Sequence, residues 1–275
     1  MKEKTVAITG ASGFIGGELV KFFLSAGWKV IGMGRKKMEV DHPFFSFVFY
    51  DLTMPPDFSQ LSSADVIIHC AFLQWSVSVQ DASPINIQAS IQLAEFCRQH
   101  NKQFVFFSSF SAHETAVSSY GRHKFQLENM FKHSHLVIKP GLVIGAKGLY
   151  AVIDKTVTER TFIPVIGRGE QPIQWIDVKT LCNAVMFGID HQFTGVFALA
   201  SVEQISFLLL LEKIAYQKRK SPYFIFLPVL VVRLLMKLFG SRMNLSEENL
   251  NGLLQLKYFD TKSALEKFQI RINPI

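Results

Sequence analysis

In the first 140 positions, short continuous apolar runs alternate with longer segments whose apolar residues have helical spacing. Apolar and polar residues alternate little within the runs, which is typical of strands in a parallel sheet covered by helices on both faces. We predict strands over 5–9, 28–33, 45–50, 66–70, 104–107 and 136–139, and helices over 14–25, 83–100 and 118–131. This order predicts an α/β fold with a doubly wound parallel sheet.

The pattern loosens after Pro140, where glycines and prolines indicate loops around one helix. A helix is predicted over 180–188 and a strand over 196–200. From Glu203 to the end only helical patterns are found. We therefore expect a sheet domain over 1–145, completed by 175–200, and a smaller, mainly helical C-terminal part over 146–174 and 201–275.

One apolar segment is ambiguous. Residues 222–232 form 11 uninterrupted apolar positions, well short of the roughly 20 that a helix needs to cross a bilayer. A buried or partly buried helix is one interpretation. The other is an interfacial helix, which gives a peripheral membrane contact, or an apolar wall for a lipid-linked substrate.

Composition and charge narrow the possible partners. The chain holds 29 Lys and Arg against 22 Asp and Glu, a formal net charge of +7, but no nucleic-acid-binding motif, so we expect no nucleic-acid partner. Three widely spaced cysteines and histidines without ligand spacing predict no metal. No apolar leader precedes the first strand and no transmembrane segment is expected, which favours a cytoplasmic location.

A glycine-rich turn joins the first strand to the first helix. Gly10 allows a tight turn, Gly13 lets the backbone approach a diphosphate, and Gly16 lets helix and strand pack closely. The N–H groups at the start of the helix and its dipole favour an anion there. We therefore predict a Rossmann-type dinucleotide-binding domain over 1–145, with cofactor contacts from Ser12, Phe14 and Ile15 as well.

The residues after the second strand discriminate between NAD and NADP. A carboxylate there would bind the adenosine ribose hydroxyls, whereas this chain has Arg35 and Lys36. An arginine can stack on adenine and pair with a 2′-phosphate, so NADP(H) is predicted over NAD. Asp51, at the end of the third strand, is placed to accept from the adenine amino group, or simply forms a turn.

Tyr120 and Lys124 lie four positions apart at the start of a predicted helix and so share one face. An ammonium beside a phenol favours the phenolate and lowers its pKa. A phenol tuned in this way can exchange a proton with a substrate hydroxyl near neutral pH. The pair therefore predicts a general acid/base.

The order of several motifs resembles that of the extended short-chain dehydrogenase/reductases. These motifs are the glycine turn, Asp51-Leu52, the segment 66–71, Phe107-Ser108-Ser109, the Tyr120/Lys124 pair and the segment 139–145. The resemblance covers residues 4–200 and implies that Tyr120 is the acid/base, that Lys124 holds the nicotinamide ribose, and that Ser109 hydrogen-bonds the reacting oxygen. Hydride then passes between the nicotinamide and the substrate. The cofactor contacts implied besides Tyr120 and Lys124 are Leu52, Cys70, Ala71, Phe72, Ser108, Pro140 and Val143.

The chain also departs from this family. Only 11 positions separate Ser109 from Tyr120, and no Asp-Glu pair follows Ser109, which favours oxidation–reduction or 4-epimerisation over dehydration. A nucleotide-activated sugar is the expected substrate, with Ser111, Trp75 and Arg168 as candidate contacts. A hydrophobic or lipid-linked alcohol or ketone is the alternative, and a non-catalytic NADP-binding sensor or assembly factor is a third. Family members often form homodimers through helices such as 84–100 and 118–132.

Overall fold

A computed structural model describes residues 4–54, 56–73, 83–239 and 247–275. The chain divides into two compact units, each built from several separate stretches. The first unit is Met1–Ser108, Gln126–Lys139 and Val178–Phe197; the second is Ser109–Phe125, Pro140–Asp177 and Ala198–Ile275. That one part of the chain binds the cofactor and the other the substrate stays a prediction.

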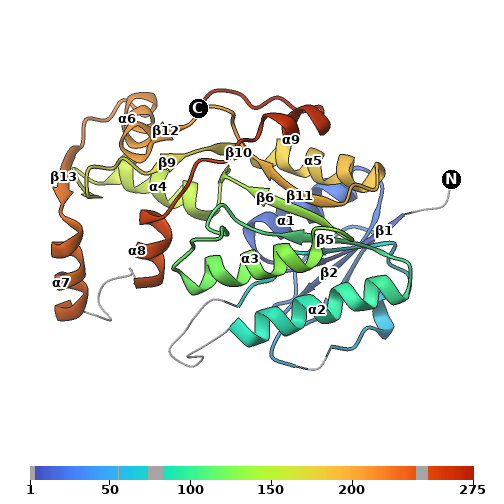
Figure 1. Ribbon diagram of the computed structural model, residues 1–275. Helices are drawn as coiled ribbons and strands as arrows, with labels where there is room; N and C mark the ends of the chain where they lie inside the picture. The colour runs from blue at the N-terminus through green and yellow to red at the C-terminus, as the bar shows by residue number, and fades with distance from the viewer. Residues whose placement is uncertain (1–3, 55, 74–82, 240–246) are drawn as a thin grey trace. The chain divides into compact units, whose positions relative to one another are not determined.

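A seven-stranded sheet in the order β11-β6-β5-β4-β1-β2-β3 dominates the first unit (Figure 1). The pairs from β6 to β3 are parallel, as the continuous apolar runs predicted. The chain order reverses between β1 and β4, so the doubly wound fold is confirmed. The strands are β1 (Thr5–Thr9), β2 (Lys29–Gly34), β3 (Phe45–Phe49), β4 (Val66–His69), β5 (Gln103–Phe107), β6 (Leu136–Pro140) and β11 (Gly195–Leu199).

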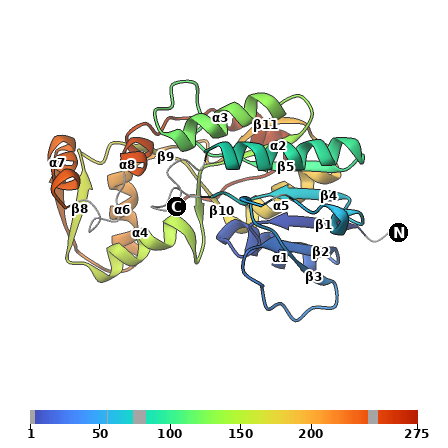
Figure 2. The ribbon, with the colours of Figure 1, turned by 90° about the horizontal axis from the view of Figure 1, so that it is seen from below.

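Helices cover both faces of this sheet (Figure 2). α1 (Phe14–Ser25) packs on β1 and β2 and against α5 (Val178–Asp190). On the other face, α2 (Ser83–Gln99) and the second half of α3 (Ser119–Phe131) pack on the strands, with one short 3-10 turn at Ser59–Leu61. Leu93, Cys97, Phe106, Leu127 and Phe131 belong to this core, and burial raises the pKa of the Cys97 thiol to about 12.

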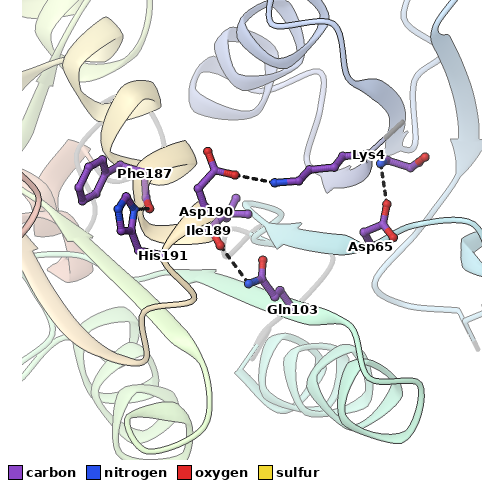
Figure 3. Close-up of polar contacts among 8 residues, drawn as sticks. Lys4, Asp65, Gln103, Phe187, Ile189, Asp190 and His191 are labelled. Carbon is purple, nitrogen blue, oxygen red and sulfur yellow. Dashed lines mark hydrogen bonds and ion pairs between the residues drawn. The ribbon is translucent and has the colours of Figure 1, made fainter. Parts of the chain in front are cut away.

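Polar contacts tie the end of α5 to the amino ends of two strands (Figure 3). The Gln103 amide donates to the carbonyl of Ile189 at 3.0 Å, and Lys4 Nζ lies 2.7 Å from Asp190 Oδ1. Asp65 accepts at 2.9 Å from the backbone N–H that follows Lys4. Because Lys4 and Asp190 are solvent-exposed, this ion pair adds little stability, and it mainly fixes orientation.

The turn between β1 and α1 packs backbone against backbone. Gly10 has φ +67°, and a Cβ there would lie 2.8 Å from the backbone nitrogen of Ala71. A Cβ on Gly16 would collide with the carbonyl oxygen of Gly10, which accepts a 2.8 Å hydrogen bond from the N–H of Gly13. Two of the three glycines, Gly10 and Gly16, therefore occupy positions that have no room for a side chain.

A buried charge pair joins α3 to β6 inside the first unit. Lys139 Nζ lies 3.2 Å from Glu128 Oε2, and the hydroxyl of Ser108 donates to the other carboxylate oxygen of Glu128. All three residues are buried. Burial lowers the pKa of Lys139, and the Glu128 carboxylate opposes that shift. The pair is satisfied only while both partners are present.

The described residues of the second unit form their own core and three two-stranded sheets: β7 with β10, β9 with β12, and β8 with β13. Val157, Ile163, Val165, Leu210 and Ile214 are among its buried residues. Its elements are β7 (Leu142–Ile144), α4 (Gly148–Glu159), β8 (Phe162–Ile166), β9 (Pro172–Ile173), β10 (Trp175–Asp177), β12 (Ile205–Ser206), α6 (Phe207–Gln217), β13 (Tyr223–Leu227), α7 (Val229–Phe239), α8 (Glu247–Leu254) and α9 (Lys262–Lys267).

The expectation of helices alone after Glu203 is wrong, because β12 and β13 lie there, and strands also interrupt the loops expected after Pro140. Residues 222–232, for which a helix was one interpretation, contain the strand β13 and the start of the helix α7. Aromatic and branched residues of β13 pair with β8, and Pro228 directly precedes α7. Proline fits the start of a helix, where its missing N–H has no helical partner to lose.

We predict that Lys139→Met lowers the free energy of unfolding by about 3–5 kcal/mol, because it removes the cation that lies beside the buried Glu128 carboxylate. Adding Glu128→Leu removes that charge and restores much of the loss. Denaturant unfolding measures both. The control is Lys155→Met, whose exposed pair with Glu159 is worth less than about 1 kcal/mol. Equal losses for Lys139→Met and Lys155→Met would contradict the prediction.

Gly10→Ala should cost about 2–4 kcal/mol of stability, because it combines a left-handed backbone with a collision against Ala71. Gly27 is the matched control: its φ is +79°, but an added Cβ has no atom within 4 Å. Gly27→Ala should therefore cost only about 1 kcal/mol. Thermal or denaturant unfolding of the two variants tests this, and similar losses would refute the close approach at Gly10.

Candidate functional site

The glycine turn opens α1 at the surface of the first unit. Ser12 and Gly13 are exposed, and Phe14 and Ile15 are half-buried. Gly13 is the N-cap of α1, no side chain caps the helix, and its first turn contains no acidic residue. The uncapped N–H groups and the positive end of the helix dipole make this turn suited to a diphosphate.

The carboxyl ends of β2 and β3 carry the residues expected to select the cofactor. Arg35 and Lys36 are exposed directly after β2. Asp51 Oδ1 accepts from the backbone N–H of Thr53 at 2.9 Å and from its hydroxyl at 2.8 Å. These bonds, and the nearby charge of Arg35, lower the pKa of Asp51. Asp51 therefore forms a turn, and its contact with adenine stays a prediction. Leu52 packs half-buried on the sheet core.

A buried histidine holds the loop after β4. The Nδ1 atom of His69 lies 2.7 Å from the Thr9 hydroxyl, and its Nε2 atom lies 3.1 Å from the Ser90 hydroxyl. The Thr9 hydroxyl also accepts from the N–H of Ala71 at 3.1 Å. The ends of β1 and β4 and one face of α2 are therefore joined through a single ring.

These contacts imply one direction of donation. Ser90 donates to the carbonyl of Asn86 at 2.7 Å, so its oxygen accepts from His69 Nε2–H, and Nδ1 then accepts from Thr9. Asn86 in turn makes two hydrogen bonds, of 2.8 and 2.9 Å, to the backbone of Leu73. The half-buried residues Cys70, Ala71 and Phe72 are held between these anchors. Sequence reasoning missed this role of His69, although a lone polar residue ending an apolar strand was a signal.

In the second unit, Tyr120 and Lys124 lie one turn apart on α3, as their spacing predicted. Tyr120 is half-buried and Lys124 is only 5% exposed. Ser118 caps the helix by accepting from the N–H of Gly121 at 3.1 Å. The cap fixes where the helix begins and hence the direction in which its first turn presents the tyrosine.

The turn that carries Ser109 and Ser111 lies against the first turn of α3. A Cβ on Gly121 would collide with the carbonyl oxygen of Ser111, so only glycine permits this approach. Ser109 is half-buried, and its hydroxyl accepts from the N–H of Ser111 at 3.2 Å. The structure therefore brings the predicted serine and tyrosine segments together, through a glycine next to Tyr120 that sequence reasoning did not single out.

Glu248 of α8 also fixes the start of α3. Its two carboxylate oxygens accept from the backbone N–H of Ser119 at 2.6 Å and from the Ser119 hydroxyl at 3.1 Å. A carboxylate at a helix N-terminus satisfies a free N–H group and interacts favourably with the dipole. No motif pointed to Glu248, because it lies 129 positions from its partner.

The remaining predicted residues differ in exposure. Ser108 is buried with its hydroxyl bonded to Glu128, Pro140 is buried at the end of β6, and Val143 is half-buried in β7. Arg168 is exposed in a turn between Gly167 and Gly169, both with positive φ. Trp75 lies outside the described residues.

Two comparisons with solved structures support the fold. UDP-glucuronic acid 4-epimerase from Bacillus cereus, solved with NAD, superposes with a TM-score of 0.70 at 20% identity, covering 94% of this chain and 99% of that one. UDP-N-acetylglucosamine 4-epimerase from Methanobrevibacter ruminantium M1, solved with UDP-N-acetylmuramic acid, has a TM-score of 0.68 at 21% identity, covering 97% and 100%.

Sequence comparisons give two relatives and a family. A ceramide reductase of Caulobacter vibrioides is 30% identical over 149 residues, 51% of this chain and 46% of that protein. UDP-glucose 4-epimerase of Vibrio cholerae is 23% identical over 95% of this chain and 90% of its own length. The model of the NAD dependent epimerase/dehydratase family matches residues 6–197. The chain therefore belongs to the NAD-dependent epimerase/dehydratase family.

Proposed function

We propose that this protein is an NADP(H)-dependent oxidoreductase or epimerase that transfers hydride at a secondary alcohol or ketone of a nucleotide-activated sugar. The observation that carries the proposal lies in the second unit, where Tyr120 and Lys124 share one face of α3 and the turn with Ser109 lies against the start of that helix at Gly121. The half-buried Tyr120 phenol and the buried Lys124, one turn apart, suit an acid/base role. Membership of the family supports the same chemistry.

In this proposal each side chain has a distinct task. Tyr120 as phenolate accepts the proton of a substrate hydroxyl during oxidation, or as phenol donates a proton to a ketone during reduction, and Lys124 stabilises the phenolate form. Ser109 donates to the reacting oxygen and orients it. When bound, the nicotinamide cofactor supplies the site that accepts or donates hydride. Positioning by the protein converts the encounter of these groups into an intramolecular step.

The described residues of the first unit fit a dinucleotide. The turn with Gly10, Gly13 and Gly16 has no room for side chains at two of these positions and offers uncapped N–H groups to a diphosphate. Arg35 and Lys36 are exposed where a 2′-phosphate is expected, which supports NADP(H), although the Bacillus cereus structure contains NAD. The proposed contacts are completed by Ser12, Phe14, Ile15, Asp51, Leu52, the loop 70–72, Ser108, Pro140 and Val143.

A nucleotide sugar is the proposed substrate because the Vibrio cholerae relative, named for UDP-glucose, matches along almost the whole chain. Ser111 and the exposed Arg168 are its proposed contacts, since a guanidinium binds a diphosphate with two parallel hydrogen bonds. A second candidate is a lipid alcohol or ketone. The 30% identity with a ceramide reductase, which spans about half of each protein, favours it.

We expect Tyr120→Phe to lower kcat by about 10²- to 10⁴-fold, because the acid/base is lost while the ring remains. Steady-state turnover on UDP-sugars and on ceramide ketone or alcohol measures this, and nicotinamide fluorescence shows whether the cofactor still binds. Tyr216→Phe is the control, since it removes a hydroxyl from an exposed position on α6. Full turnover by Tyr120→Phe would overturn the assignment, and cofactor binding without turnover by the unaltered protein favours the sensor alternative.

Arg35→Ala should weaken NADPH binding by about 10- to 100-fold and leave NADH binding nearly unchanged, because only NADPH carries the 2′-phosphate. Fluorescence titration of both cofactors gives the two dissociation constants. Arg98→Ala removes an exposed arginine from the end of α2 and serves as the control. A chain that binds NADH tenfold more tightly than NADPH would refute the preference.

A further inference from the structure

The sheet formed by β8 and β13 is apolar on both faces. Ile163, Val165 and Phe224 pack on the core of the second unit. The opposite face carries Phe162, which is 60% exposed, and Tyr223, which is 66% exposed, and their rings stack at 5.7 Å. Pro164 and Ile225, paired in register, are exposed on that face too. A sheet face that meets only water normally carries polar residues, so that polar and apolar residues alternate along each strand.

The helix α7 directly follows β13 and also exposes apolar residues (Figures 1 and 2). Val232 of α7 is buried, whereas Leu230 is 79% and Leu234 is 56% exposed. Leu230 and Leu234 are one turn apart and therefore share a helix face, and the exposed cations Arg233 and Lys237 lie beside them. Apolar residues flanked by lysine and arginine are typical of helices that lie in a membrane interface.

The net charge of the protein comes from this region. Between Glu212 and Glu247 the sequence has seven Lys and Arg residues and no acidic one. Taking these seven from the 29 cations leaves 22, equal to the 22 acidic residues, so the rest of the chain is formally neutral. Six of the seven lie in described positions; Lys218 is 3.1 Å from Asp154, and Arg233 is 3.9 Å from Glu247. The Arg233 pair is exposed on both sides and therefore weak, whereas Asp154 in the Lys218 pair is half-buried.

We propose that the outer face of β8 and β13, together with the exposed side of α7, docks on an anionic lipid surface. In the part of the chain that the structure describes, no helix is long and apolar enough to cross a membrane. The proposed contact of the 11-residue helix α7 is with the surface of the bilayer. A second copy of the chain is a poorer occupant, because a symmetric contact would bring two sets of cations together. Anionic headgroups complement those cations while acyl chains cover the apolar side chains.

Sedimentation of the full chain with vesicles tests this proposal. Binding is expected to phosphatidylcholine vesicles that contain about one third phosphatidylglycerol, to weaken with added salt, and to be much lower on phosphatidylcholine alone. Leu230→Ser with Leu234→Ser should weaken binding by about tenfold or more, and Arg233→Gln with Lys237→Gln by about tenfold. Leu149→Ser with Val152→Ser, on the exposed side of α4, should change nothing.

Circular dichroism shows whether each variant folds, and turnover on a water-soluble substrate should be unchanged in all of them. The proposal is independent of the substrate, so failure of the proposed reaction leaves the vesicle result intact. Absence of binding to anionic vesicles would overturn it. So would a dimer that the leucine substitutions convert to monomer without any vesicle binding, because the face would then join two copies.

Discussion

The first unit depends on an approach of two backbones that only glycine permits. Gly10 lies against Ala71 where β1 and β4 end, and Gly16 lies against the carbonyl of Gly10. These contacts bring the start of α1 close to the loop after β4. The His69 ring holds the same loop through its hydrogen bonds with Thr9 and Ser90. Steric fit and a buried hydrogen-bond chain thus act on one short stretch of backbone, where a cofactor of this family is expected.

The same device recurs in the second unit. Gly121 lets the serine turn approach α3, and the Ser118 cap and the Glu248 carboxylate fix where that helix begins. The chemistry proposed for Tyr120 needs accurate orientation more than local flexibility. Small residues and helix-end hydrogen bonds provide that orientation, since neither adds side-chain freedom.

The position of the excess positive charge along the chain indicates more about partners than the net charge alone. A net charge of +7 spread evenly would indicate little about partners, whereas here the excess coincides with the apolar residues of β13 and α7. In water, hydration is favourable for the cations but unfavourable for the exposed apolar side chains. An interface between water and lipid accommodates both.

Local periodicity and spacing along the chain were enough to predict the doubly wound sheet, the glycine turn and the placement of Tyr120 and Lys124 on one helix face. It did not determine β13, since an apolar aromatic segment fits either a strand or a helix until β8 is available to pair with it. His69, Gly121 and Glu248 owe their roles to partners distant in sequence. Those partners meet only when the chain is folded, so the roles of these three residues could not be predicted from local sequence.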